Sequence, residues 1–397
     1  MITSTPMRRA AASVGWLFLL LPLTGCGVFN GVFRHVNVQP LATTFQRPSN
    51  VGAYVAISDN DVPLTELEPS NFRVYENAQL VPAEQTQLTL LDTNLVAAHQ
   101  VVLLMDMSAA QTPAARTTAA KAALNFVEKV MPHEAVSIFA FDGGESLVPI
   151  ATLPRGNGTV TMAALENFTP RDTSRNLNGA VVAGLGKLDA LLGQSGKVVR
   201  VGTLVVFASG PDVAGRVDRD KAHDAVWQSP YDVLGVGVGE QADAIENLAR
   251  RGLVRSQAAD TLPIAFEEVA TKTIEQLEKH YLVSYCSPAR AGTRRLRLEV
   301  SYTNKEGEEH HGDFETEFSA KGFGPGCNAS VTPRFFLPTK PSTGPEPNPG
   351  SSLSSDAKSG DAKSGDAKGK KPPPDSRLHD QGEDAPVAPP DQSGYAK

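Results

Sequence analysis

The pattern of apolar and polar residues changes twice along the sequence. Residues 50–92 alternate apolar and polar positions between frequent turns, as in VGAYVAI, FRVYEN and QLTLLD, and this pattern predicts short antiparallel strands. Residues 96–282 instead contain near-continuous apolar runs, VVLLM, SIFAF, TLVVFA and VLGVGV, separated by helical stretches. Such runs are typical of parallel strands that helices cover on both faces. From residue 283 to about 320 the alternating strand pattern returns.

These three patterns predict a doubly wound α/β domain with a mostly parallel sheet, flanked by β-rich segments. We assign 50–95 to the first β-rich flank, 96–282 to the α/β domain and 283–330 to the second flank. Each flank alone is too small to close a core. Together they offer roughly seven strands, enough for a small sandwich, so we expect one β-sandwich with the α/β domain inserted into it.

Both ends of the chain have a different composition. Arg8 and Arg9 precede the apolar run VGWLFLLLPL and then Cys26, which predicts a signal peptide over residues 1–26 rather than a membrane span. Residues 27–49 then form a leader. Residues 331–397 are rich in Pro, Gly, Ser, Lys and Asp, with little apolar surface to bury, and this composition predicts a disordered tail.

Net charge, cysteine content and the absence of catalytic motifs limit the classes of function that the sequence supports. The formal net charge of −7 disfavours nonspecific nucleic-acid binding. If Cys26 is modified, Cys286 and Cys327 remain as an even pair, and we expect a disulfide between them. No nucleophile elbow, P-loop or pair of catalytic carboxylates is present in the sequence, so nothing predicts an enzyme or a small-molecule substrate.

Four further patterns favour ordinary structure over binding sites. The histidines at 310–311 read as a solvated hairpin end, and SDND at 58–61 reads as an Asx-rich turn. The glycines of GVGVGE lie within a strand, so close helix packing explains them better than a dinucleotide does. Residues 142–145 read as a hairpin turn.

Asp106 ends the first apolar run of the α/β domain, in VVLLMDMSAA. Ligands of open α/β sheets bind outside the carboxyl ends of the strands, so the place suits a site. An uncompensated buried carboxylate would cost several kcal/mol or take up a proton, so Asp106 needs a partner.

Two family resemblances add to this interpretation. Leu23-Thr24-Gly25-Cys26 resembles a bacterial lipobox, which implies a lipid anchor on Cys26 and, because Gly27 follows, favours the outer membrane. DMSAA resembles the DxSxS start of a von Willebrand factor type A domain, and NLNGAVVAGL and LVVFASG follow in that family's order. The strands before and after the α/β domain resemble those of bacterial proteins related to this family. The resemblance covers about residues 50–320.

The resemblance implies a metal-ion-dependent adhesion site, in which Mg²⁺ held by oxygen ligands binds an acidic group of a partner protein. Here the pattern is degenerate. Asp106 and Ser108 are retained, but the second serine is Ala110 and Ser209 stands where the fourth-strand turn normally has an aspartate, with Asp212 three residues later. Arg175 aligns with the threonine of the second loop, and a small shift would place Ser174 or Thr173 there instead.

Two hypotheses follow for Asp106. In the first, Arg175 pairs with Asp106 and replaces the metal. In the second, Ser108, Asp212, Thr173 or Ser174 and waters still hold Mg²⁺ around it.

The favoured function is a lipid-anchored envelope protein that binds another, unknown protein without metal. The alternatives are a Mg²⁺-dependent adhesion protein and a structural component of the envelope.

Overall fold

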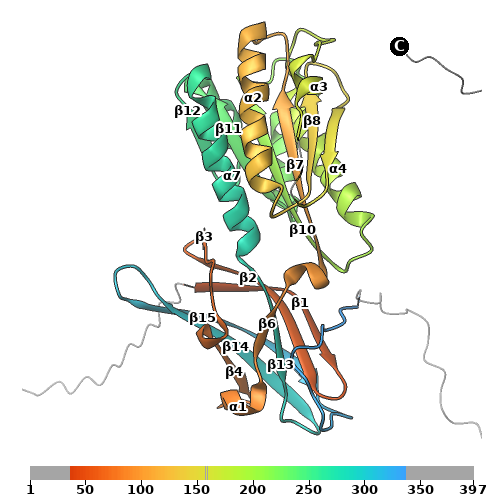
Figure 1. The fold of residues 1–397 in the computed structure, drawn as a ribbon, viewed down its shortest axis with the longest axis vertical. Helices are drawn as coiled ribbons and strands as arrows, with labels where there is room; N and C mark the ends of the chain where they lie inside the picture. The colour runs from red at the N-terminus through yellow and green to blue at the C-terminus, as the bar shows by residue number, and fades with distance from the viewer. Residues whose placement is uncertain (1–35, 157, 159, 337–397) are drawn as a thin grey trace, which may run out of the picture. The chain divides into compact units, whose positions relative to one another are not determined.

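A computed structural model describes residues 36–156, 158 and 160–336 (Figure 1). The predicted signal peptide with Cys26, the first part of the leader and the tail from residue 337 lie outside these residues. Within the described ranges, no helix is both long enough and apolar enough to cross a membrane. The described strands form three sheets.

The α/β domain is built on a six-stranded sheet in the order β12-β11-β10-β7-β8-β9. Its strands are β7 Ala97–Asp106, β8 Val136–Phe141, β9 Val148–Leu153, β10 Val199–Ala208, β11 Asp232–Val238 and β12 Leu253–Ser256. All neighbours pair in parallel except β8 and β9. The predicted doubly wound, mostly parallel sheet is confirmed. The edge strands β9 and β12 were not predicted, because one is half-exposed and the other is only four residues long.

Helices cover both faces of this sheet (Figure 1). They are α2 Pro113–Val130, α3 Ala163–Glu166, α4 Leu177–Gly193, α5 Arg219–Gln228, α6 Asp243–Glu246 and α7 Leu262–Glu278. Side chains alternate along β7, so Leu103 packs in the core with α2 and α7 while Leu104 packs in the opposite core with α4 and α5. The continuous apolar run of β7 exists because both of its faces are buried.

The β-rich flanks form two further sheets that share one core. Sheet A contains β1 Val36–Gln46, β2 Asn50–Asp59, β3 Val62–Pro63, β6 Thr89–Leu91 and β13 His280–Cys286. Sheet B contains β4 Phe72–Glu76, β5 Gln79–Leu80, β14 Thr293–Thr303 and β15 Glu309–Ser319. Each sheet combines strands from both flanks, and their buried side chains form one cluster. The predicted single sandwich with an inserted α/β domain is therefore confirmed. Short helices α1 Ala83–Thr86, η1 Pro69–Asn71, η2 Thr93–Leu95, η3 Gly239–Ala242 and η4 Ala259–Thr261 complete the described elements.

Three predicted boundaries are wrong. Residues 36–46, assigned to the leader, form edge strand β1, in which Val36 and Val38 are buried against the sandwich core. Strand β13 begins at His280, within the segment assigned to the α/β domain. Residues 331–336 were assigned to the disordered tail, yet Thr44 donates a hydrogen bond to the Arg334 carbonyl at 2.7 Å. All three boundaries depend on contacts with distant strands, which local composition does not reveal.

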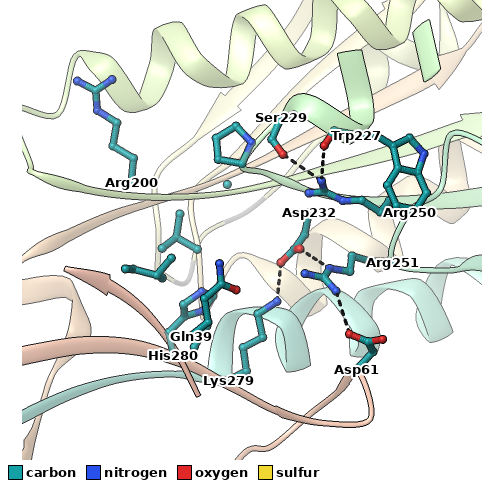
Figure 2. Close-up of a pocket in the computed structure, with 15 residues that line it drawn as sticks. Gln39, Asp61, Arg200, Trp227, Ser229, Asp232, Arg250, Arg251, Lys279 and His280 are labelled. Atoms are coloured by element: carbon teal, nitrogen blue, oxygen red, sulfur yellow. Dashed lines mark hydrogen bonds and ion pairs between the residues drawn. The ribbon is translucent and has the colours of Figure 1, made fainter. Parts of the chain in front are cut away.

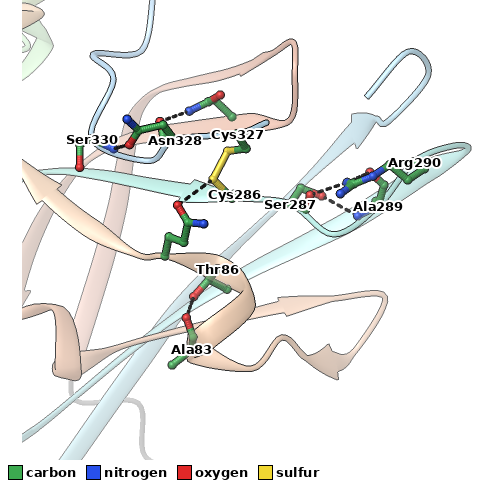
Figure 3. Close-up of a disulfide and its surroundings, with 11 residues drawn as sticks. Ala83, Thr86, Cys286, Ser287, Ala289, Arg290, Cys327, Asn328 and Ser330 are labelled. Carbon is green, nitrogen blue, oxygen red and sulfur yellow. Dashed lines mark hydrogen bonds between the residues drawn. A yellow bond between two sulfur atoms is a disulfide. The ribbon is translucent and has the colours of Figure 1, made fainter. Parts of the chain in front are cut away.

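A disulfide joins Cys286, at the end of β13, to Cys327, with a Cα–Cα distance of 5.8 Å (Figure 3). The loop that it closes contains the hairpin of β14 and β15. The disulfide prediction is confirmed, and the bond ties the last described segment to sheet A.

Candidate functional site at the carboxyl edge of the parallel sheet

Asp106 and Ser209 lie at the carboxyl ends of the two central strands, β7 and β10. The strand order reverses between these two strands, because the chain proceeds from β7 to β8 in one direction and returns to β10 on the other side. This topological switch point is where open α/β sheets bind ligands. We call the loops at this edge the crest, defined as residues 106–112, 171–176 and 209–215.

The Asp106 carboxylate is fully buried, and both of its oxygens accept hydrogen bonds. Oδ1 accepts from the backbone N–H of Ser108 at 3.0 Å and from its hydroxyl at 2.7 Å. Oδ2 accepts from Nε of Arg175 at 2.6 Å, and from the backbone N–H and hydroxyl of Ser209 at 3.0 and 2.7 Å. Five donors, one of them charged, therefore compensate the burial of this carboxylate.

Each of the three guanidinium nitrogens of Arg175 donates a hydrogen bond. Besides the bond from Nε to Asp106, Nη1 donates to the Pro211 carbonyl at 3.1 Å and Nη2 donates to the Ser209 hydroxyl at 2.7 Å. The residue is 5% exposed. A Cβ at Gly210 would lie 2.7 Å from Nη1, so the loop after β10 needs glycine to admit the guanidinium. The loop and the arginine thus fit each other closely.

The remaining residues predicted for the site have other positions. Ala110 and Thr173 are exposed, and Ser174 donates its hydroxyl hydrogen bond to Asp172 at 2.7 Å. Asp212 accepts hydrogen bonds from the backbone N–H groups of Asn178 and Gly215, so it satisfies the first turn of α4. The structure thus brings together Asp106, Ser108, Arg175 and Ser209, and leaves Ala110, Asp212, Thr173 and Ser174 outside the cluster.

This donor set does not fit a divalent cation. Mg²⁺ requires near-octahedral oxygen ligands at about 2.0–2.1 Å. Each oxygen of Asp106 already faces hydrogen-bond donors, and the guanidinium of Arg175 brings a positive charge to the place where a cation would bind. Among the described residues, no group of three or more His, Cys, Asp or Glu side chains is arranged to hold a metal ion.

Two residues that support the site were not singled out for it from the sequence. Gln111 donates to the Asp106 carbonyl at 2.5 Å. The carboxylate of Asp142, predicted only as part of a hairpin turn, accepts from the backbone N–H groups of Arg171 and Asp172 at 2.7 and 3.2 Å. Asp142 therefore fixes the loop that carries Arg175. Its place at the end of β8, beside Asp106 at the end of β7, was the available signal.

Above the buried ion pair, the exposed side chains of the crest are mostly small or apolar. Ala109 and Ala110 follow Ser108 directly, and Val213 is 60% exposed. The backbone N–H of Val213 donates to the Arg175 carbonyl at 2.9 Å, so this loop is bonded to the backbone of the residue that pairs with Asp106. Arg171 and Thr173 of the crest are exposed as well, whereas Asp106 is fully buried.

The other patterns singled out from the sequence are structural. A Cβ at Gly237 would lie 2.4 Å from the Cβ of Ala242, so the glycines of β11 permit close packing, as predicted. The hairpin interpretation of 142–145 is also confirmed, because this segment links antiparallel β8 and β9. The histidines at 310–311 do lie near the turn of the β14–β15 hairpin, as predicted. The prediction that this end is solvated is wrong for His310, whose side chain is 12% exposed and whose Nδ1 lies 2.6 Å from Oδ2 of Asp59, so that the patterns 58–61 and 310–311 meet.

Comparison with known proteins gives only distant likenesses. No protein-family model matches the sequence, and no curated protein matches it. Among solved structures, the chain is similar to proximal thread matrix protein 1 from the mussel byssus, with 12% identity over 44% of this chain and 48% of that chain and a TM-score of 0.35. The chain thus spans about half the length of that protein. It is also similar to a von Willebrand factor type A protein from Catenulispora acidiphila, with 10% identity over 71% and 72% of the two chains and a TM-score of 0.38. A third similar structure is the manganese-loaded TRAP protein of Plasmodium vivax, with 10% identity, coverage of 63% and 98%, and a TM-score of 0.33.

Proposed function

We propose that this is a lipid-anchored envelope protein that binds another protein through the crest, without a divalent cation and without catalysis. The observation that carries the metal-independent part is the buried ion pair between Asp106 and Arg175 at 2.6 Å. The guanidinium supplies the positive charge that a metal ion would otherwise bring to Asp106.

Protein binding is supported by the position of the crest at the topological switch point and by the resemblance of DMSAA to the start of a von Willebrand type A domain. Because no cation is presented to a partner, recognition relies on the exposed surface of the crest. Ala109, Ala110 and Val213 are exposed apolar side chains of the crest, and the carboxylate of Asp106 and the guanidinium of Arg175 are already paired. The partner is therefore expected to contact the crest with apolar side chains.

Anchoring is supported by the Leu-Thr-Gly-Cys sequence that ends at Cys26. Acyl chains on this cysteine would hold the mature protein at a membrane, because each buried CH₂ contributes about 0.8 kcal/mol. Replacement of Cys26 by alanine is expected to release the protein into the soluble fraction and to abolish the acylated N-terminus in mass spectrometry. A protein that stays membrane-bound without Cys26 would contradict the anchor.

The binding proposal is tested by chemical crosslinking in intact cells, followed by quantitative recovery of the full-length protein. Val213→Asp puts a charge on the crest without touching the ion pair. Val331→Asp is the matched control, since Val331 is 57% exposed but lies beyond β15. We expect the crosslinked partner to be lost with Val213→Asp and retained with Val331→Asp, with equal recovery in EDTA and in Mg²⁺.

Two outcomes would contradict this function. Equal recovery of the partner from both valine variants would show that the crest is not the binding surface and would favour a structural role. Recovery that depends on Mg²⁺ would show that a cation does take part, against the geometry around Asp106.

A further inference from the structure

A second candidate site lies at the opposite edge of the parallel sheet, where the α/β domain meets the sandwich. It is a pocket of about 560 Å³ (Figure 2). Its walls come from β1 and β2 of the sandwich, the first residues of β10, the segment before β11, the segment before β12 and the end of α7. It shares no lining residue with the crest, so its role is independent of the function proposed above.

The pocket carries an excess of positive charge. Four arginine and lysine side chains line it, Arg200, Arg250, Arg251 and Lys279, against two carboxylates, Asp61 and Asp232. The difference, four minus two, is two positive charges, in a chain whose formal net charge is −7. Local charge of this sign raises the concentration of anions at the pocket.

The two carboxylates are already used. Asp232 is buried and bonds Lys279 at 2.8 Å and Arg251 at 2.7 Å. Burial acts to raise the pKa of Asp232, but these two cations outweigh it and the pKa is lowered, so Asp232 remains ionised. Asp61 is exposed and lies 3.9 Å from Arg251. Neither carboxylate is an ion-pair partner of Arg250 or Arg200.

Arg250 lacks a counter-ion in the described part of the chain. Its guanidinium donates to the carbonyls of Ser229 at 3.0 Å and Trp227 at 3.4 Å (Figure 2). It also donates to the Tyr231 carbonyl. Its Nε is buried without a hydrogen-bond partner. Burial, and the positive charge of nearby Arg251, lower the pKa of Arg250. The nearby carboxylate of Asp232 partly opposes this lowering. Carbonyl groups thus orient this cation, and no described carboxylate forms an ion pair with it.

An aromatic ring lies at the same pocket. Trp227 is 56% exposed, an unusual position for so large an apolar side chain, and Leu41 of β1 is 42% exposed and lines the pocket with it. A pocket that combines a few polar groups with exposed apolar surface is the usual form of a small-molecule site. The charged group of a ligand would bind the arginines while its apolar part contacted Trp227.

We propose that this pocket binds a small organic anion, one that carries a phosphate or carboxylate group next to a flat apolar moiety. Arginine recognises both anionic groups through paired N–H donors. The ligand is expected to contact residues of the sandwich and of the α/β domain at once, and so to stabilise their packing.

The chain itself provides the probe for a test. It has two tryptophans, Trp16 and Trp227, so the full-length Trp16→Phe protein reports Trp227 fluorescence alone. This protein is titrated with phenyl phosphate, phenylacetate and the neutral benzyl alcohol, and its thermal unfolding is measured with each. We expect a saturable fluorescence change and a higher unfolding temperature with one or both anions, and neither with benzyl alcohol. The comparison of the two anions distinguishes a phosphate site from a carboxylate site.

Two variants link the signal to the pocket. Arg250→Gln removes the cation that has no ion-pair partner among the described residues, and Leu41→Glu adds a carboxylate at a residue that lines the pocket and is 42% exposed. Placing one negative charge within several ångströms of the bound anion is expected to weaken binding about tenfold. The matched controls are Arg295→Gln and Leu80→Glu, on exposed positions of sheet B. If neither anion changes the fluorescence or the unfolding temperature, or if Leu41→Glu binds as tightly as Leu80→Glu, the proposal is wrong.

Discussion

Replacement of Arg175 by methionine tests the central feature of the crest. Methionine keeps most of the side-chain volume but removes the positive charge and three hydrogen-bonding contacts, to Asp106, Ser209 and Pro211. The Asp106 carboxylate would then be buried with four neutral donors from Ser108 and Ser209 as its partners.

The expected loss of stability follows from burial. The Asp106 side chain is 0% exposed and that of Arg175 is 6% exposed, so solvent screens the pair little. Removal of one partner of a buried ion pair typically costs about 3–5 kcal/mol, because the other charge is left uncompensated. The four remaining hydrogen bonds to Asp106 place our expectation at the lower end, about 3 kcal/mol.

Urea unfolding of the full-length protein, followed by circular dichroism, measures this loss. The double variant Arg175→Met with Asp106→Asn removes both charges, and it is expected to lose less than the sum of the two single variants because no uncompensated carboxylate remains. Arg255→Met is the control, since Arg255 forms exposed ion pairs with Asp243 and Glu246. It should unfold almost as the parent does.

A metal titration separates the two hypotheses for Asp106. Arg175→Thr restores the oxygen that the resemblance implies, and Mg²⁺ at about a hundred times its dissociation constant would then add about 2.7 kcal/mol. The parent protein should show no such gain. An Arg175→Met variant within about 1 kcal/mol of the parent, or a parent stabilised by Mg²⁺, would refute the interpretation of the pair as a replacement for the metal.

Three further predictions concern stability. Burial raises the pKa of Glu134 from its ordinary 4.5 to about 7, so its contribution to stability is present below pH 4.5 and is lost as the pH rises through 7. Relative to Glu134→Gln, the parent should lose about 3 kcal/mol over this range in urea unfolding at a series of pH values. Reduction of the bond between Cys286 and Cys327, which are 41 residues apart, should lower the stability of the sandwich by about 2–4 kcal/mol, whereas a Cys286→Ser variant should be insensitive to reductant. Gly237→Ala should cost about 1–3 kcal/mol because its Cβ would lie 2.5 Å from the backbone Cα of Ala242, and unchanged stability would contradict the packing role of this glycine.

The parts of the fold that were predicted correctly have strong local patterns. The runs that became β7, β8, β10 and β11 are continuous because two helical layers bury both faces of the sheet. The edge strands were missed for the opposite reason, since half-exposed strands such as β1 and β9 lack such a run. Pro40, within β1, has no backbone N–H to donate, which an edge strand tolerates.

The crest was predicted in part, because the position of some of its residues in the sequence indicates their role. Asp106 stands at the end of an apolar run, which is visible in the sequence, but its partner Arg175 is 69 residues away and was identified through alignment with a family pattern. Asp142, whose carboxylate holds the loop of Arg175, is marked only by its place after the second apolar run, and its residue type is also that of an ordinary turn residue. Hydrogen bonds to the backbone, unlike apolar periodicity, leave no repeated signal in the sequence.

The pocket could not be predicted at all, because no single segment contains it. Arg250 and Arg251 read locally as the polar end of a helical stretch, and Lys279 and Trp227 as residues near the ends of two others. The net charge of −7 disfavours nonspecific nucleic-acid binding and gives no sign of a site for small anions. That argument concerns the field of the whole molecule, whereas a ligand inside a pocket responds mainly to charges within about one Debye length, some 8–10 Å at physiological ionic strength. Within that distance the fold brings together basic residues that lie far apart in the sequence. The net charge of the pocket is therefore positive, although the net charge of the whole chain is negative.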